Sequence, residues 1–330
     1  MKLDPFTLAM ALVVGVATVL PCRGDVARGF ALATSIAIGL LFFSHGARLP
    51  REVVRAGVLH WRLHLLVLAS TFLLFPLLGM AFTYLAASFT TPSLRAAVLY
   101  LCIVPSTVQS SIALTSLARG NVAAAVCSAS LSSIVGVVAT PLLARVLRLT
   151  ESTAGGSLDA VIDISYQLLV PFAVGQLLRS RIRVWVDRQG RRWRLLDQGS
   201  ILLVVYTAFS AAVVQGLWRE LPARALFALV PMTVLLLSAA LLVTWQSSRA
   251  LGLSREDQIV AIFCGSKKSL ATGVPLANVL FPAGVVGAMV LPLMLYHQLQ
   301  LMVGAALAQR YAARLERALG PVGSVARDES

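Results

Sequence analysis

The chain has 330 residues, of which 58% are hydrophobic and only 13% are charged. A soluble domain carries about 25% charged residues, so this composition excludes a soluble globular protein and indicates an integral membrane protein. The net charge of +14 resides in short loops between apolar segments rather than on one soluble face, which argues against a nucleic-acid partner. Backbone groups in lipid must be paired, and the segments lack the alternation of barrel strands, so we expect helices.

Ten apolar segments approach the length of about 20 residues that crosses a bilayer. The first, with Asp4 and Pro5 at its start, is interpreted as a span rather than a cleaved signal peptide. A basic stretch at 48–62 is either an interfacial amphipathic segment or an ordinary loop. The first five predicted spans are residues 6–20, 29–43, 63–85, 94–117 and 121–147; the others are 164–178, 201–217, 226–245, a broken span within 259–291, and a last one over about 284–307.

The loop charges predict the orientation of these spans. With ten spans, 19 basic residues fall on one side of the membrane and 7 on the other. The positive-inside rule then places both termini in the cytoplasm. We expect the protein to lie in the plasma (inner) membrane.

Two of the spans contain a polar interruption. The fourth turns polar at residues 105–111, and the ninth at 265–269. Pro105 and Gly265 are 160 residues apart, each in the fourth span of a five-span half. An odd number of spans inverts the second half relative to the first, and inverted halves with matching broken helices indicate a transport site. The predicted fold is an all-α membrane protein with two inverted five-helix repeats, residues 1–150 and 151–330.

Both interruptions carry groups that suit a hard cation such as Na⁺. An unwound helix exposes carbonyl oxygens, and nearby hydroxyl and amide oxygens can complete the shell. Ser128 and Ser132 lie four residues apart on one helix face and could point to the same place. For any single serine, the alternative is that a small hydroxyl only permits close helix packing. The candidate cation-binding residues are Ser106, Thr107, Gln109, Ser110, Ser128, Ser132, Ser266 and Ser269.

Lys267 and Lys268 lie inside the ninth span. A lysine at a bilayer centre costs about 2.5–3.5 kcal/mol, so the pair requires a reason. Either side chain could attract an anionic substrate, replace a coupling cation through its own protonation, or extend to the membrane surface. Adjacent helical residues point in different directions, so one shared role is not expected. The candidate substrate-binding or coupling residues are Lys267, Lys268, Thr272, Asn278, His297 and Gln298; Gln300 is polar too but receives no role.

The sequence contains no nucleophile elbow, phosphate loop or cluster of metal ligands. The four cysteines have no paired spacing and are interpreted as free thiols. We therefore expect no enzyme activity, no catalytic residues, no metal site and no cofactor other than Na⁺ as a coupling ion.

Several segments resemble the bile acid:sodium symporter superfamily, and within it the branch of solute carrier family 10 member 7. The most specific is F-C-G-S-K-K-S-L-A-T-G-V-P-L-A at 263–277. The others are H-G-A-R-L-P-R-E at 45–52, P-S-T-V-Q-S-S-I-A at 105–113, A-R-G-N-V-A-A-A at 118–125, D-Q-G-S-I-L-L-V-V-Y at 197–206 and L-P-L-M-L-Y-H-Q-L-Q-L-M at 291–302.

The resemblance implies a panel of spans 1, 2, 6 and 7 and a core of spans 3–5 and 8–10, with broken spans 4 and 9 crossing. It also implies alternating access and cation sites behind the crossing. Family members bind sodium partly through a carboxylate and a glutamine on the ninth span, where this sequence has Ser266-Lys267-Lys268-Ser269.

The leading hypothesis is a secondary active transporter, a sodium-coupled symporter of a small organic anion. Its partners would be membrane lipid and that solute. One alternative is a proton-coupled or uncoupled carrier in which a lysine replaces the cation. Another is a non-transporting membrane regulator of ion homeostasis.

Overall fold

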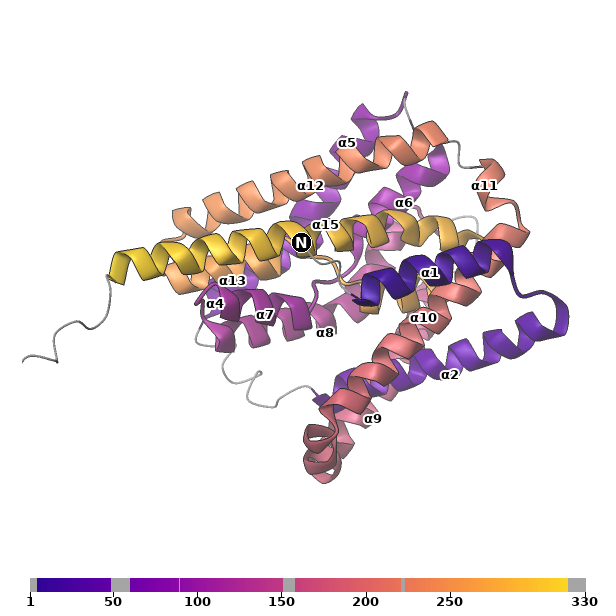
Figure 1. Cartoon of the computed structure of the whole chain (residues 1–330), viewed down its shortest axis with the longest axis horizontal. Coiled ribbons are helices and arrows are strands. Elements are labelled where there is room, and N and C mark those ends of the chain that lie inside the picture. Colours follow the sequence, from indigo (N-terminus) through magenta and orange to yellow (C-terminus); the bar gives the residue numbers. More distant parts are fainter. Residues whose placement is uncertain (1–4, 49–59, 89, 151–157, 221–222, 320–330) are drawn as a thin grey trace, which may run out of the picture.

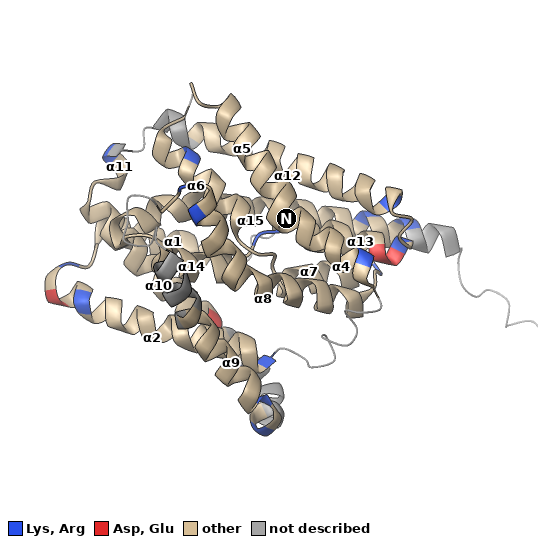
Figure 2. Cartoon of the chain, turned by 180° about the vertical axis from the view of Figure 1, so that it is seen from behind, with Lys and Arg blue, Asp and Glu red and all other residues tan. Residues whose placement is uncertain are grey.

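The computed structural model describes residues 5–48, 60–88, 90–150, 158–220 and 223–319, and all regular structure in these ranges is helical. The helices pack side by side into one bundle (Figure 1). Lys, Arg, Asp and Glu gather mostly at the helix ends (Figure 2). Six helical segments are long and apolar enough to cross a membrane: Gly24–Arg48, Trp61–Leu85, Val122–Val146, Leu195–Val214, Phe227–Ala250 and Ala283–Arg314.

Each predicted span coincides with a helix or with consecutive helical pieces. The first half contains α1 (Pro5–Val19), α2 (Gly24–Arg48), α4 (Trp61–Ala69), the π-helical turn η1 (Ser70–Leu74), α5 (Phe75–Leu85), α6 (Pro92–Ile103), α7 (Gln109–Leu117) and α8 (Val122–Val146). The second half contains α9 (Leu158–Arg188), α10 (Gly190–Val214), α11 (Leu217–Glu220), α12 (Ala223–Ala250), α13 (Arg255–Gly265), α14 (Leu270–Leu280) and α15 (Ala283–Leu319).

The helices extend further than the apolar segments alone indicate. The basic stretch at 179–194, which lies between the predicted sixth and seventh spans, is almost entirely helical, since α9 continues to Arg188 and α10 begins at Gly190. Arginine is a good helix former, so charge ends the apolar span without ending the helix. Most of the basic stretch at 48–62 lies outside the described residues.

Helices α2 and α9 pack with their backbones nearly in contact. A Cβ atom at Gly46 would lie 2.0 Å from the carbonyl oxygen of Phe172, and one at Gly175 would lie 2.1 Å from that of Phe43. Small residues permit such close approach between membrane helices. The two glycines therefore allow α2, from the first half of the chain, to pack closely against α9, from the second half.

We expect Gly46→Val and Gly175→Val each to destabilise the protein, because the new side chain must push α2 and α9 apart. Overpacking of this kind costs about 1–3 kcal/mol or more. Thermal unfolding of the detergent-purified variants measures the loss. Gly39→Val on α2 is the matched control, since a Cβ there meets nothing within 4 Å. An equal loss in the control would mean that helix propensity, not contact, is responsible.

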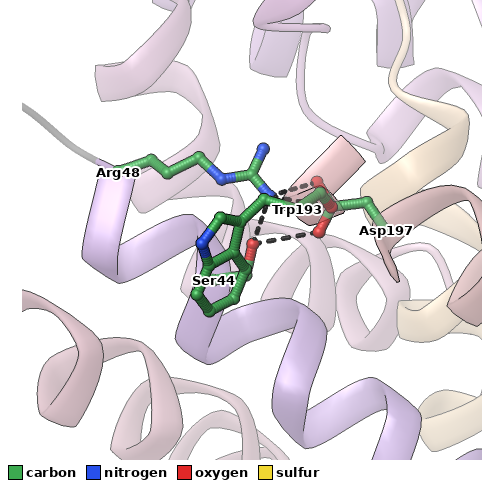
Figure 3. A network of polar contacts seen from close by, with 4 residues as sticks. All are labelled: Ser44, Arg48, Trp193 and Asp197. Carbon is green, nitrogen blue, oxygen red and sulfur yellow. Dashed lines mark hydrogen bonds and ion pairs between the residues drawn. The ribbon is translucent and has the colours of Figure 1, made fainter. Parts of the chain in front are cut away.

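A partly buried ion pair joins α2 to α10 (Figure 3). The Arg48 Nη2 atom lies 2.7 Å from Oδ2 of Asp197, and Ser44 Oγ donates a hydrogen bond of 2.9 Å to its Oδ1. The Arg48 guanidinium also lies 5.8 Å from the centre of the Trp193 ring. Asp197 is 6% exposed, and removing one partner of such a pair leaves an uncompensated charge. The pair thus holds α2 and α10 in one relative position.

Candidate functional site

The first interruption predicted from the sequence lies between α6 and α7. Helix α6 ends at Ile103, two residues before Pro105, and Val104 is extended with φ −72° and ψ 152°. A residue before proline avoids the helical region, which explains this end. The last carbonyl groups of a helix have no partner within it and require donors from elsewhere.

The second interruption lies between α13 and α14, where residues 266–269 are not helical. The side chain of Ser269 accepts a hydrogen bond from the backbone N–H of Thr272 and so caps the start of α14. The backbone N–H of Ser269 also donates to the carbonyl oxygen of Pro105 at 2.7 Å. The two interruptions therefore contact each other directly.

Two serines of the first interruption donate hydrogen bonds to the last carbonyl groups of α13. Ser106 Oγ donates to the carbonyl oxygen of Cys264 at 2.6 Å, and Ser111 Oγ to that of Phe263 at 3.0 Å. Each interruption thus supplies the hydrogen-bond partners that the other lacks.

A third irregular segment, η1, lies beside them. Here the N–H of Phe75 bonds to the carbonyl of Ser70, five residues back. In the same register the carbonyl of Thr71 would need the N–H of residue 76, but that residue is a proline and has none. Pro76 therefore leaves the carbonyl oxygen of Thr71 available to another donor.

Lys268 is that donor. Its Nζ donates hydrogen bonds to three backbone carbonyl oxygens, those of Thr71 at 2.8 Å, Cys102 at 2.7 Å and Val104 at 2.9 Å. The same atom lies 4.1 Å from the centre of the Phe75 ring. The side chain is 0% exposed, so it does not extend to the membrane surface. Three acceptors match the three N–H bonds of an ammonium group.

Lys267 is equally buried, at 1% exposed, but has weaker contacts. Its Nζ lies 3.4 Å from the carbonyl oxygen of Gln300 and 6.0 Å from the centre of the Phe263 ring. A Cβ atom at Gly304 would lie 3.1 Å from this nitrogen. The charge of Lys267 is therefore much less compensated than that of Lys268.

Gln300 fixes the backbone between the two lysines and α14. Its Oε1 accepts from the N–H of Lys268, and its Nε2 donates to the carbonyl of Lys268, both at 2.8 Å. The same Nε2 lies 2.9 Å from His297 Nδ1. No role is predicted for Gln300 from the sequence, although its spacing of three from His297 places both on one face of a helix.

Several other candidates lie around the two interruptions. Ser132 Oγ accepts from the backbone N–H of Ser106 at 3.1 Å. The Thr107 hydroxyl lies 2.6 Å from that of Ser110. Two further hydroxyls have partners elsewhere: Ser128 Oγ lies 2.7 Å from His64 Nδ1, and Ser266 Oγ donates to the carbonyl of Ile262 at 2.6 Å.

Three candidates are placed differently. Gln109, the first residue of α7, has an exposed side chain. Asn278 belongs to α14 but lines a separate cavity beside α2 and α10. Gln298 is half-buried on α15. The lysine site thus combines the segment between α13 and α14 and residues of α15 with carbonyl groups of η1, of α6 and of Val104 just after α6.

Comparison with known proteins gives a consistent assignment. The sequence model of the SBF-like CPA transporter family matches residues 4–313. The chain is 58% identical to an uncharacterized protein of Pseudomonas aeruginosa over 96% of this chain and 95% of that protein. It is 51% identical to "Putative symporter YfeH" of Escherichia coli, again over 96% and 95%. It is 27% identical to "Sodium/bile acid cotransporter 7" of Xenopus tropicalis over 92% and 90%.

Proposed function

Because the chain belongs to the SBF-like CPA transporter family, we propose that it is a secondary active transporter that carries a small organic anion by alternating access. In this proposal the chain forms ten transmembrane helices in two inverted repeats, residues 1–150 and 151–330, in the inner membrane. Helices α6–α7 and α13–α14 are the broken fourth and ninth spans. The equal place of the two breaks in their halves, and their direct contact, support this arrangement.

The moving parts in the proposal are a panel of α1, α2, α9 and α10 and a core of the other long helices. The close packing of α2 on α9 and the Arg48–Asp197 pair between α2 and α10 support a rigid panel. The core would be held together by the reciprocal hydrogen bonds of the two interruptions. The charge of the loops supports cytoplasmic termini.

The observation that carries the proposal for coupling is the set of three carbonyl oxygens around Lys268 Nζ. Carbonyls of unwound helices hold the coupling cation in many transporters. The ammonium group supplies the same single positive charge as Na⁺ but is attached to the chain. We therefore favour the lysine-based carrier over sodium symport, with Lys268 as the fixed cation and Lys267 as the group whose protonation changes during transport.

Sodium symport is the second candidate, and a cluster of three hydroxyl groups favours it. Thr107 Oγ1 lies within 3.2 Å of the hydroxyls of both Ser110 and Ser111. Ser111 Oγ also donates to the carbonyl oxygen of Phe263 at the end of α13, and Ser106 Oγ donates to that of Cys264. These are oxygen ligands of the kind that bind hard cations.

Uptake into proteoliposomes under imposed gradients distinguishes the candidates. For a panel of radiolabelled carboxylates and sulfonates, we expect accumulation under an inward proton gradient without any need for sodium. Accumulation that requires an inward sodium gradient would select the symporter instead. Failure to take up any member of the panel under either gradient would favour the membrane regulator of ion homeostasis. Vesicles treated with a protonophore or a sodium ionophore are the controls.

A further inference from the structure

The end of α12 lies beside the start of α4. Helix α12 contacts α4, η1 and α5, so it runs along this whole helical segment. A Cβ atom at Gly265 would lie 3.0 Å from Thr244 of α12 and 3.3 Å from Ser70 of η1. Leu253, just after α12, packs against the apolar cluster that contains Leu63 of α4. The two helices are therefore antiparallel, and the end of α12 and the start of α4 lie at the same end of the bundle.

Both helices present an exposed apolar face that ends in a tryptophan. On α4, Leu65 and Trp61 are exposed and lie four residues apart, hence on one face. On α12, Leu242 and Trp245 are exposed and lie three residues apart. In a protein that spans a membrane, exposed leucines face the acyl chains, and tryptophan is enriched at the level of the headgroups. This end of α4 and α12 therefore lies at the headgroup level on one side of the membrane.

An arginine stacks on each of these tryptophans. The Cζ atom of Arg62 lies 5.5 Å from the centre of the Trp61 ring, and that of Arg249 lies 5.1 Å from the centre of the Trp245 ring. Both arginines are exposed, and neither pairs with a carboxylate in the part of the chain that the structure describes. A guanidinium group held against a ring still offers its N–H groups to an anion. Two positive charges are thus available at the headgroup level.

The carboxylates of the neighbouring helix do not neutralise these two charges. Helix α13 begins with Arg255, Glu256 and Asp257, of which the first two have opposite charges. Asp257 has partners of its own, since Nδ1 of His60 lies 3.3 Å from its Oδ2 and Nδ2 of Asn121 donates a hydrogen bond of 3.0 Å to its Oδ1. Figure 2 shows basic and acidic residues near α4 and α13. The surface at the adjacent ends of α4 and α12 thus keeps a net positive charge.

We propose that the adjacent ends of α4 and α12 form a binding site for an anionic phospholipid. Its headgroup pairs with the guanidinium groups of Arg62 and Arg249, and its acyl chains lie along Leu65 and Leu242. Arginine matches the geometry of phosphate oxygens, and basic residues beside a membrane attract acidic headgroups. A zwitterionic lipid brings its own ammonium group, which competes with the arginines for the phosphate. The site therefore prefers acidic lipids, and lipid binding there requires no transport activity.

The unfolding midpoint of the whole protein in a neutral detergent measures this binding, because a ligand that binds only the folded state raises the midpoint. We expect dioctanoyl phosphatidylglycerol to raise it at concentrations about tenfold lower than dioctanoyl phosphatidylcholine, which has the same acyl chains. Glycerol phosphate, which has the negative charge without the chains, should have no effect at these concentrations.

Two substitutions locate the site. Arg62→Gln and Arg249→Gln should each raise the phosphatidylglycerol concentration needed for a given shift by about fivefold, and should leave the response to phosphatidylcholine unchanged. Arg219→Gln is the matched control. Arg219 is also exposed and follows an exposed tryptophan, Trp218, but it lies on α11, which precedes the opposite end of α12. Each variant is compared with its own midpoint without lipid, so that a change in intrinsic stability does not affect the result.

Equal stabilisation by the two lipids, or by glycerol phosphate, would overturn the proposal on the unmodified protein alone. A preference for phosphatidylglycerol that Arg62→Gln and Arg249→Gln leave intact, or that Arg219→Gln lowers as much, would overturn it too, because the lipid would then bind elsewhere. A dimer in lipid-free detergent that both substitutions dissociate, observed by light scattering, would assign the surface to a second copy of the chain instead.

Discussion

Replacement of Lys268 by methionine is expected to give a protein that is strongly destabilised and inactive in uptake. Methionine fills a similar volume but donates no hydrogen bond, so the carbonyl oxygens of Thr71, Cys102 and Val104 lose their partner. Each unpaired buried acceptor costs about 1–3 kcal/mol, and the interaction with the Phe75 ring is lost as well. The yield of monodisperse protein and its thermal unfolding midpoint measure the effect.

Lys267→Met is the matched control for stability, because Lys267 is buried to the same degree but its Nζ donates only one hydrogen bond, of 3.4 Å, within the described part of the chain. Chemical rescue separates a bound cation from simple packing. In Lys268→Ala, ethylammonium should restore part of the lost stability, since it brings an ammonium group to the vacated carbonyls, while ethanol should not. If both lysine variants unfold at the same temperature, or if ethanol rescues as well as ethylammonium, the carbonyl site does not require a cation.

The position of the two interruptions could be predicted because it depends on residue types that are visible in the sequence. Pro105 forces the residue before it out of the helical region, and Gly265 precedes a polar stretch in an apolar span. The partners of Lys268 could not be predicted in this way. They are backbone carbonyls of residues 71, 102 and 104, and a carbonyl oxygen carries no signature of side-chain type. The carbonyl oxygen of Thr71 has no partner within its own helix, and this follows only from the π-helical register of η1 at Pro76.

Two glutamines show why the direction of a side chain limits prediction of the site. Gln109 is a predicted cation ligand, but its side chain is exposed at the start of α7. Gln300, for which no role is predicted, is 1% exposed, and its side chain binds both the backbone N–H and the carbonyl oxygen of Lys268. Whether a polar side chain reaches the site depends on which way it points, and after a helix break that direction depends on where the next helix begins.

Replacement of Lys267 by glutamine is expected to uncouple transport from the proton gradient. Lys267 is the buried charge with the weaker compensation, so its proton can be exchanged with less loss of structure than that of Lys268. The variant cannot change its charge, and an inward proton gradient should therefore no longer concentrate the solute. Exchange of labelled for unlabelled solute at equal concentrations should continue. Initial uptake and equilibrium exchange, each measured in acidic and alkaline buffer, give the two quantities.

The ratio of accumulation to exchange distinguishes coupling from a structural role. A residue that only supports the fold would lower both quantities together, whereas loss of the coupling group lowers accumulation alone. Lys267→Arg, which keeps its charge at every accessible pH, should likewise show no accumulation, because release of the proton is what completes the cycle. Arg310→Gln, an exposed position on α15, is the matched control for loss of one positive charge. If Lys267→Gln still concentrates the solute under a proton gradient, Lys267 is not the group that couples transport to protons.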